Sequence, residues 1–195
     1  MNEPSAQFDD QQLIRETLDG KPEAFGSLIQ KYQNRLYNGM VHVLRNEVEA
    51  EDVVQDAFVL AYTKLNTFKG KSAFFTWLYR IAYNAAITRI RRRRPTVSLE
   101  GKDEGQRLDF PDAGSAPSDR MQRDEQSVQL NQALEKLSEE HRSILVLREM
   151  EDMDYEAISE ILDLPIGTVR SRLHRARGQL KEQLEIIMGS DADGA

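Results

Sequence analysis

Residues 49–94 read EAEDVVQDAFVLAYTKLNTFKGKSAFFTWLYRIAYNAAITRIRRRR, and this stretch decides the fold. It begins as an acidic, amphipathic segment, continues through a group of aromatic residues and ends in an arginine run. Apolar residues recur at three- and four-residue spacing in both long segments, which is typical of helices that bury one face. Aromatic rings beside a basic run are typical of proteins that bind unpaired nucleic acid.

The first segment predicts a helix over residues 49–65 with two different faces. The apolar face suits a core and consists of Ala50, Val53, Val54, Ala57, Phe58 and Ala61. The opposite face mixes acids with aliphatic side chains, namely Asp52, Gln55, Asp56, Val59, Leu60 and Thr63. This second face is either merely solvated or, because exposed aliphatics have a polar rim, a docking surface for another protein.

A loop around Gly70 precedes a helix predicted over residues 73–94, with Ser72 as its N-cap. The expected core residues of this helix are Phe74, Trp77, Leu78, Ile81, Ala85 and Ile90. Four further side chains of this helix are not needed for that core, namely Phe75, Tyr79, Tyr83 and Asn84, and form a surplus. These side chains either fill a small helical domain or, with Lys69, Lys71 and Arg80 nearby, stack on bases.

The arginine run at the end of this helix comprises Arg91, Arg92, Arg93 and Arg94. Successive residues of a helix advance by about 100°, so the four side chains cannot share one face. They must project from an end that leaves the domain body. The run is therefore expected to contact DNA phosphates, or else to be a solvated basic helix end.

Two amphipathic helices are predicted before this stretch, over residues 9–19 and from Pro22 to Leu44. Residues 96–120 are acidic and interrupted by glycine and proline, which predicts a linker. Its contour of roughly 80 Å exceeds two turns of DNA of about 34–36 Å each. The linker could thus allow two DNA-binding domains of one chain to reach separated sites on DNA. Its composition is equally consistent with a passive tether.

From Met121 onward further helices are predicted, with an apolar face of Val128, Leu130, Ala133, Leu134 and Leu137, a turn with Ser138 as N-cap, and then the core residues Ile144, Leu145, Leu147 and Met150. Residues 154–177 have helix-turn-helix patterning. Asp154 is the expected N-cap, residues 163–165 form the turn, and the inward residues of the last helix are Ile166, Val169, Leu173, Ala176 and Leu180. Its outward face carries Arg170, Ser171, His174, Arg175 and Arg177. Arginines there can contact guanine edges or phosphates, whereas His174 either contacts a base or is simply exposed.

Charge and composition restrict the class of protein. The net charge of −7 is unevenly distributed, because residues 77–95 and 165–181 are basic and contain no acid. The chain has no cysteine and only three scattered histidines, which argues against disulfides and a zinc site. The polar start and the lack of a long apolar run predict a cytoplasmic protein. No catalytic constellation or cofactor motif is present, so neither an enzyme nor a cofactor is expected.

The quoted stretch and, independently, residues 151–181 with IGTVRSRLHRAR resemble the extracytoplasmic-function (ECF) sigma factors of the sigma-70 superfamily. The resemblance covers about residues 9–95 and 121–188. It implies an all-α chain of two domains. These are region 2 over residues 1–95 and region 4, with the helix-turn-helix, over residues 121–188, joined by a flexible acidic linker at 96–120. A disordered tail is expected at 189–195.

The resemblance also implies roles for individual residues. The positions expected to bind core RNA polymerase are Asp52, Gln55, Asp56 and Val59. Those expected at the minus-ten element, where a flipped base is captured and the DNA is opened, are Lys69, Ser72, Phe74, Trp77, Tyr79, Arg80 and Asn84. The DNA backbone is assigned to the arginine run, and the minus-thirty-five element to Thr168, Arg170, Ser171, His174 and Arg175.

The function implied is that of a transcription initiation factor, active in an envelope or other stress response. The implied partners are the clamp helices and beta flap of core polymerase, promoter DNA and an anti-sigma factor, with a monomer when these are absent. An ordinary helix-turn-helix regulator would leave residues 49–63 and the aromatic helix without a task. A single-strand or RNA-binding adaptor would leave the recognition helix unexplained.

Overall fold

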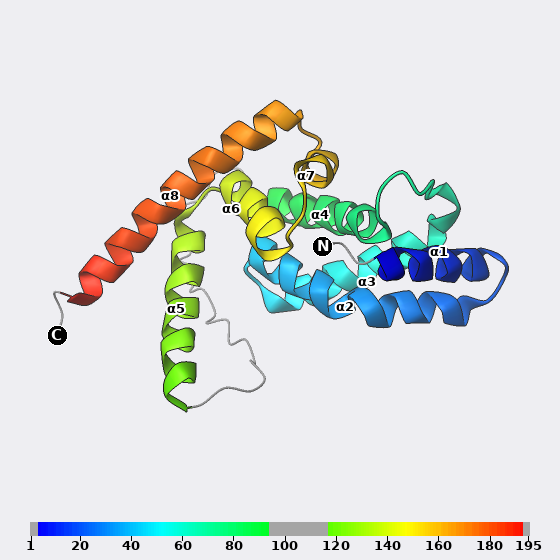
Figure 1. The fold of residues 1–195 in the computed structure, drawn as a ribbon, viewed down its shortest axis with the longest axis horizontal. Helices are drawn as coiled ribbons and strands as arrows, with labels where there is room; N and C mark the ends of the chain where they lie inside the picture. The colour runs from blue at the N-terminus through cyan, green and yellow to red at the C-terminus, as the bar shows by residue number, and fades with distance from the viewer. Residues whose placement is uncertain (1–3, 94–116, 193–195) are drawn as a thin grey trace.

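The computed structural model describes residues 4–93 and 117–192, and every regular element in these ranges is helical (Figure 1). The first half contains α1 (Pro4–Leu18), α2 (Pro22–Leu44), α3 (Glu47–Thr63), the 3-10 turn η1 (Leu65–Thr67) and α4 (Phe74–Arg93). The second half contains α5 (Pro117–Lys136), α6 (Glu139–Leu145), the π-helical turn η2 (Val146–Met150), α7 (Tyr155–Leu162) and α8 (Ile166–Ala192). The prediction of an all-α fold is confirmed. Arg94 and most of the predicted linker lie outside the described residues.

The first half is a four-helix unit in which α1, α3 and α4 contact the long central helix α2 or its neighbours. The side chain of Asn46 caps α3 by accepting a hydrogen bond from the backbone N–H of Glu49 at 2.9 Å. The buried residues of α3 are the six of the predicted apolar stripe. The packing therefore leaves the acidic and aliphatic face of α3 toward solvent.

The second half consists of helices that pack against α8. The predicted caps are present, because the side chain of Ser138 accepts from the backbone N–H of His141 and that of Asp154 from Ala157. Asp163 ends α7 with a left-handed φ of 54°, which turns the chain into α8. The sequence α7, turn and α8 is the predicted helix-turn-helix.

Several details differ from the sequence-based expectation. Met150 is exposed rather than core, since residues 146–150 form a π-helical turn instead of extending α6. Ile166 and Val128, both expected to face inward, are also exposed. Helix α5 already begins at Pro117, and α8 continues to Ala192 through much of the expected tail.

The two halves contact each other. Helix α7 packs on α4, while α6 and η2 pack on α2. The buried apolar residues of both halves form one contiguous cluster. Within residues 4–93 and 117–192, no helix combines the length and apolar character needed to cross a membrane.

Candidate nucleic-acid interface

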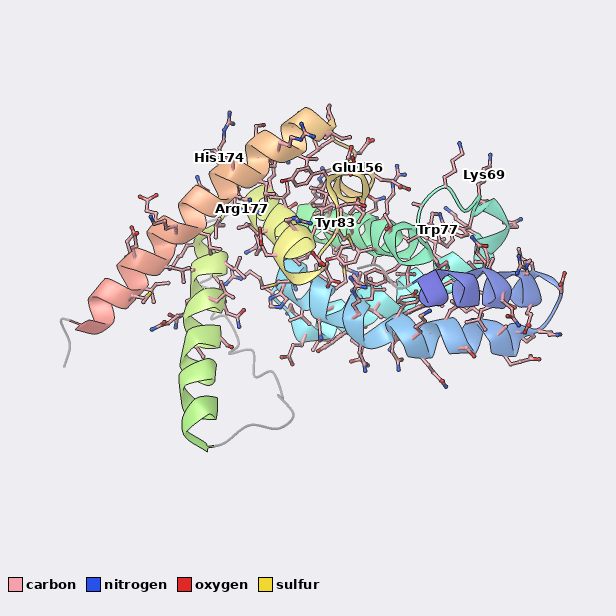
Figure 2. The ribbon with its side chains drawn as sticks, in the orientation of Figure 1. Lys69, Trp77, Tyr83, Glu156, His174 and Arg177 are labelled. Atoms are coloured by element: carbon pink, nitrogen blue, oxygen red, sulfur yellow. The ribbon has the colours of Figure 1, made fainter. Side chains whose placement is uncertain are left out.

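The outer face of α8 presents the residues predicted to read duplex DNA. Val169, Leu173 and Ala176 are fully buried and fix which side of α8 faces the core. The opposite side exposes Arg170, Ser171, His174 and Arg175, with Thr168 half-buried beside them. Figure 2 shows His174 on the side of α8 away from α6. The five predicted side chains thus lie on one exposed stretch of helix, as a recognition helix requires.

Neighbouring contacts divide the arginines of α8 into two groups. Arg172 pairs with Glu140 at 3.1 Å, and Arg177 pairs with Glu149 at 2.7 Å. Both are therefore engaged within the second half. The guanidinium of Arg170 instead lies 5.8 Å from the ring centre of Tyr155, a distance typical of a cation–π contact. Tyr155 was not among the predicted site residues, because its position next to the Asp154 cap carries no separate signal.

The exposed face of α3 carries the four residues predicted to bind polymerase. Asp52, Gln55, Asp56 and Val59 are all exposed, and Val59 retains 68% of its accessible surface. Two of these residues already have an intramolecular partner. The guanidinium of Arg89 on α4 donates to Asp52 at 3.1 Å and to Asp56 at 2.9 Å.

The described part of the arginine run spreads around the end of α4, as its helical spacing predicted. Arg91, Arg92 and Arg93 are exposed. Arg93 turns toward α3 and pairs with Glu49. Arg91 instead lines a cleft against the second half. These three side chains consequently do not form a single basic stripe.

The predicted minus-ten residues separate into exposed and buried side chains. Lys69 is exposed and projects away from the helices, and Asn84 is also exposed (Figure 2). Trp77 is half-buried, with its ring 5.3 Å from that of Phe68. In contrast, Phe74 is 2% exposed and Tyr79 fully buried. Neither ring is accessible to a base in this structure, and the assignment of these two positions to the minus-ten element stays a prediction.

The burial of these aromatics results from the orientation of α4. The buried residues of this helix are Phe74, Phe75, Thr76, Leu78, Tyr79, Ala82 and Ala86. The ring of Phe75, expected in the surplus, stacks on Tyr32 of α2 at 5.2 Å. The stripe from Phe75 through Leu78, Tyr79, Ala82 and Ala86 is displaced by about one residue from the predicted one. Helix α4 packs against α2, α3 and α7, so more of its circumference is covered than one amphipathic face allows.

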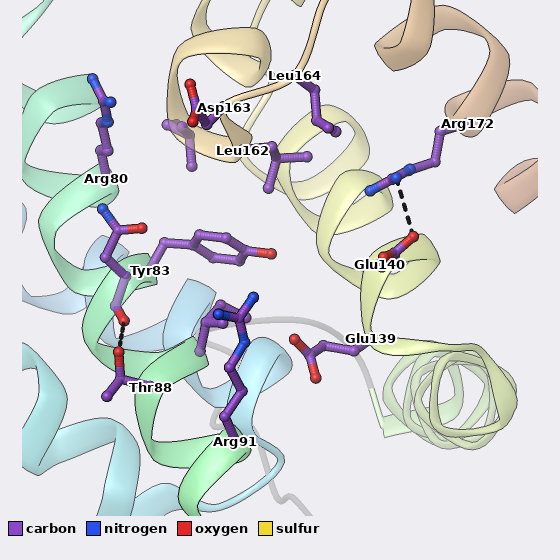
Figure 3. Close-up of a pocket in the computed structure, with 13 residues that line it drawn as sticks. Arg80, Tyr83, Thr88, Arg91, Glu139, Glu140, Leu162, Asp163, Leu164 and Arg172 are labelled. Atoms are coloured by element: carbon purple, nitrogen blue, oxygen red, sulfur yellow. Dashed lines mark hydrogen bonds and ion pairs between the residues drawn. The ribbon is translucent and has the colours of Figure 1, made fainter.

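A cleft of about 630 Å³ separates the outer face of α4 from the second half (Figure 3). Arg80, Tyr83 and Asn84 line one side, and Leu162 and Arg172 line the other. The ring of Tyr83 extends from α4 into this space, and burial raises its pKa above the ordinary value for tyrosine.

Glu160 of α7 contacts two predicted minus-ten residues near this cleft. Its carboxylate accepts a hydrogen bond from the hydroxyl of Ser72 at 3.2 Å and lies 3.9 Å from the guanidinium of Arg80. Ser72 is therefore not the N-cap of α4, because the residue before Phe74 is Ala73 and the Ser72 hydroxyl is directed to the second half. The first helix of the helix-turn-helix thus covers part of the predicted minus-ten surface.

Among the described residues, an ionic contact between the halves joins Arg35 of α2 to the buried Glu151. The guanidinium donates to the Glu151 carboxylate at 2.8 Å and to its backbone carbonyl at 2.6 Å. It also stacks over the ring of Phe75 at 4.2 Å. Glu151 is 5% exposed, and this burial raises its pKa although Arg35 acts in the opposite direction. The π-helical turn places Glu151 here, with its N–H bonded to the carbonyl of Val146.

Two family models match most of the chain. Residues 28–96 match Sigma-70 region 2, and residues 127–180 match Sigma-70, region 4. The RNA polymerase sigma-H factor of Pseudomonas aeruginosa is 38% identical over 187 residues, which cover 93% of this chain and 97% of that protein. The ECF RNA polymerase sigma-E factor of Escherichia coli is 36% identical over 189 residues, covering 94% and 98%.

Two solved structures have a similar arrangement of helices. CnrH, in complex with the cytosolic domain of CnrY, has a TM-score of 0.67 and 26% identity, with coverage of 91% of this chain and 98% of that one. The sigma factor RpoE of Bartonella quintana, in complex with the anti-sigma factor NepR, has a TM-score of 0.67 and 25% identity, with coverage of 83% and 97%.

Proposed function

Because the chain belongs to the ECF family of sigma factors, which direct RNA polymerase to promoters without enzymatic activity, we propose that three exposed surfaces divide the work of promoter recognition. The outer face of α8 reads the minus-thirty-five element. The exposed face of α3 binds core polymerase. The loop before α4 and the exposed side chains of α4 hold the minus-ten element.

The observation that carries this proposal is the recognition face of α8. Arg170 and Arg175 are exposed and have no ion pair within the described residues, whereas Arg172 and Arg177 are paired. Unpaired guanidinium groups can bind guanine edges bidentately. The ring of Tyr155 beneath Arg170 supports one orientation of that side chain before DNA arrives.

The α3 surface has the chemistry expected of a polymerase-docking site. Asp52, Gln55 and Asp56 provide acceptors around the apolar side chains of Val59 and Leu60, which are 68% and 39% exposed. The clamp helices of the largest polymerase subunit are the proposed partner. The second half is proposed to contact the beta flap.

The minus-ten surface is proposed to consist of Lys69, Ser72, Trp77, Arg80 and Asn84. These five side chains are at least partly exposed, unlike those of Phe74 and Tyr79. The two buried aromatics instead shape the domain that supports the reader. A base drawn out of the duplex could stack on the accessible edge of Trp77 while Lys69 and Arg80 hold its phosphates.

Promoter recognition is further proposed to require separation of the two halves. Ser72 and Arg80 contact Glu160 in this structure, so the minus-ten surface is partly covered. The similar structures of CnrH and RpoE were solved with CnrY and NepR bound, respectively. By analogy, an anti-sigma factor is a proposed regulator of this chain, and the cytoplasm, where polymerase acts, is its proposed location.

A pull-down with bacterial core polymerase, followed by run-off transcription on a genomic fragment library, tests this function. Stoichiometric association and new sequence-selective transcripts are expected. Arg170→Ala with Arg175→Ala should abolish promoter selection without loss of core binding. Lys181→Ala is the control, because it removes a cation from the same helix where the side chain is 79% exposed and paired with Glu185.

A matching change on α3 tests the docking surface. Asp52→Lys with Asp56→Lys should weaken association with core polymerase while the far-ultraviolet circular dichroism stays unchanged. Undiminished association would remove these acids from the interface. Tight, sequence-specific duplex binding without any association with core would identify an ordinary transcriptional regulator instead.

A further inference from the structure

The acidic side chains of α3 form ion pairs with arginines at the end of α4. Arg89 bridges Asp52 and Asp56, which lie one helical turn apart, through separate nitrogens at 3.1 and 2.9 Å. One turn further toward the end of α4, Arg93 pairs with Glu49. The hydrogen bond to Asp52 is the main cause of the raised pKa of Arg89. Two neighbouring helices are therefore joined by a ladder of opposite charges, which we name the α3–α4 latch.

The latch links two surfaces with separate proposed tasks. Asp52 and Asp56 belong to the surface proposed to bind polymerase, whereas Arg89 precedes, and Arg93 belongs to, the run proposed to bind DNA phosphates. A guanidinium whose N–H groups are directed to carboxylates has its charge compensated and cannot hold a phosphate with the same groups. The acids likewise cannot give their full charge to a cation of the polymerase while Arg89 is bound.

We propose that the α3–α4 latch exchanges partners when the polymerase docks. Cationic groups of the polymerase take over the acids of α3, and Arg89 and Arg93 are released to the DNA backbone. This inference rests on the proposed function and specifies the regulation of its docking surface. The free factor would then bind DNA weakly, and docking would add two phosphate contacts at the end of α4.

Because the latch is exposed to solvent, little free energy is needed to break its ion pairs. The side chains of Asp52 and Asp56 are 57% and 68% exposed, and that of Arg89 is 30% exposed. Ion pairs this accessible to water contribute little to folding stability. Opening the latch therefore leaves the helix packing intact. Because coupling between two binding equilibria is reciprocal, DNA bound to the released arginines must strengthen polymerase docking by the same factor.

A double-mutant cycle on the full-length free protein tests the latch without polymerase. The probe is a fluorescent 40-base-pair duplex, and its affinity is measured by anisotropy over a series of salt concentrations. Asp52→Asn with Asp56→Asn should increase affinity roughly fivefold at low salt. The slope of log affinity against log salt should become steeper by about 0.9, the value for one additional phosphate contact. Adding Arg89→Gln should remove this gain, whereas Arg89→Gln alone should change little.

A charge-matched control separates the latch from general electrostatics. Glu47→Gln with Glu51→Gln removes the same charge from the same helix, and neither glutamate has an ion pair in the described part of the chain. The control should increase affinity less and leave the slope unchanged. An equal gain in the control, a gain that survives Arg89→Gln, or no gain in the Asp52 and Asp56 variant would overturn the proposal.

A second measurement examines the exchange itself in the polymerase complex. Arg89→Gln should reduce the salt dependence of promoter binding by the holoenzyme, although it does not affect the free protein. If Arg89→Gln changes the salt dependence of DNA binding neither in the free protein nor in the holoenzyme, the proposed release of Arg89 on docking is refuted. If Asp52→Asn with Asp56→Asn leaves core binding intact, the docking proposal fails, and the cycle on the free protein still reports separately whether the latch restrains Arg89.

Discussion

Arg35→Ala is expected to separate the two halves of the molecule. Arg35 is the partner of Glu151, a carboxylate that is 5% exposed and comes from the other half. The substitution removes both hydrogen bonds to Glu151 and the contact with the ring of Phe75. It leaves the buried Glu151 carboxylate without its cation, so the free energy of contact between the two halves becomes less favourable.

The magnitude follows from the burial of each partner. Removing one partner of a fully buried ion pair costs about 3–5 kcal/mol. Arg35 is 49% exposed, which places the loss of this pair below that range, at about 2–2.5 kcal/mol, while the lost stacking on Phe75 adds about 0.5–1 kcal/mol. We expect about 3 kcal/mol, or roughly a hundredfold in the equilibrium between contacting and separated halves.

The effect should depend on pH with a defined sign. The pKa of Glu151 is raised in the closed arrangement, so its protonated form is the one that this arrangement favours. A raised carboxyl pKa contributes stability at pH values below the ordinary pKa, and this contribution is lost as the pH rises through the raised pKa. Without Arg35 the pKa rises further. Acidification should therefore restore part of the contact in Arg35→Ala.

Fluorescence energy transfer provides the assay, because the chain has no cysteine and accepts two engineered ones. Dyes at Glu51→Cys on α3 and Lys181→Cys on α8 report the separation of the halves. Lys31→Ala is the matched control, since it breaks a pair with the buried Asp10 at 2.7 Å inside the first half. It should lower the melting temperature without changing the energy transfer. Unchanged transfer in Arg35→Ala between pH 5 and 8 would refute this account of the contact.

Substitutions at three further positions, with matched controls, test the packing near this contact and the cap of α7. In urea unfolding, Gly39→Ala should destabilise the fold by about 2 kcal/mol, because its Cβ would lie 2.7 Å from the Tyr79 hydroxyl and 2.9 Å from a Glu151 carboxylate oxygen. Gly26→Ala on the same helix is the control. Its Cβ would have open space, so this substitution should stabilise the fold by about 0.5–1 kcal/mol. Tyr79→Phe should leave the melting temperature equal or higher, since that buried hydroxyl has no hydrogen-bond partner in the described structure, and a clear loss would reveal a partner. Asp154→Ala should cost about 1 kcal/mol by removing the cap of α7, and Asp154→Ser should restore most of it.

The sequence was sufficient for the elements whose signal is local. The stripe of α3 from Ala50 to Ala61 follows directly from apolar spacing, and all six predicted residues are buried. The caps Ser138 and Asp154 could be identified because a side chain needs only the backbone three residues away. The exposed face of α8 followed from the burial of its opposite face.

The features that could not be predicted from the sequence depend on contacts between segments that are distant in the chain. The burial of Phe75 and Tyr79 could not be predicted without knowing that α4 is covered by helices from both halves. The pairing of Arg35 with Glu151 joins positions 116 residues apart, so no local pattern could indicate it. The same holds for Arg89, which was predicted to be part of a basic patch although its charge is compensated by Asp52 and Asp56 of α3.

Helix α8 extends without interruption for 27 residues, from Ile166 to Ala192, which corresponds to about 40 Å. The face that carries Arg170 lies near its beginning, while Met188, which is 58% exposed, lies near its far end. Because the helix is continuous, a change in the direction of its first turns also moves its far end. A tilt of about 10° around its first turns displaces the far end by about 7 Å over that length. A partner bound at the far end would therefore influence the angle at which the recognition face meets the DNA groove.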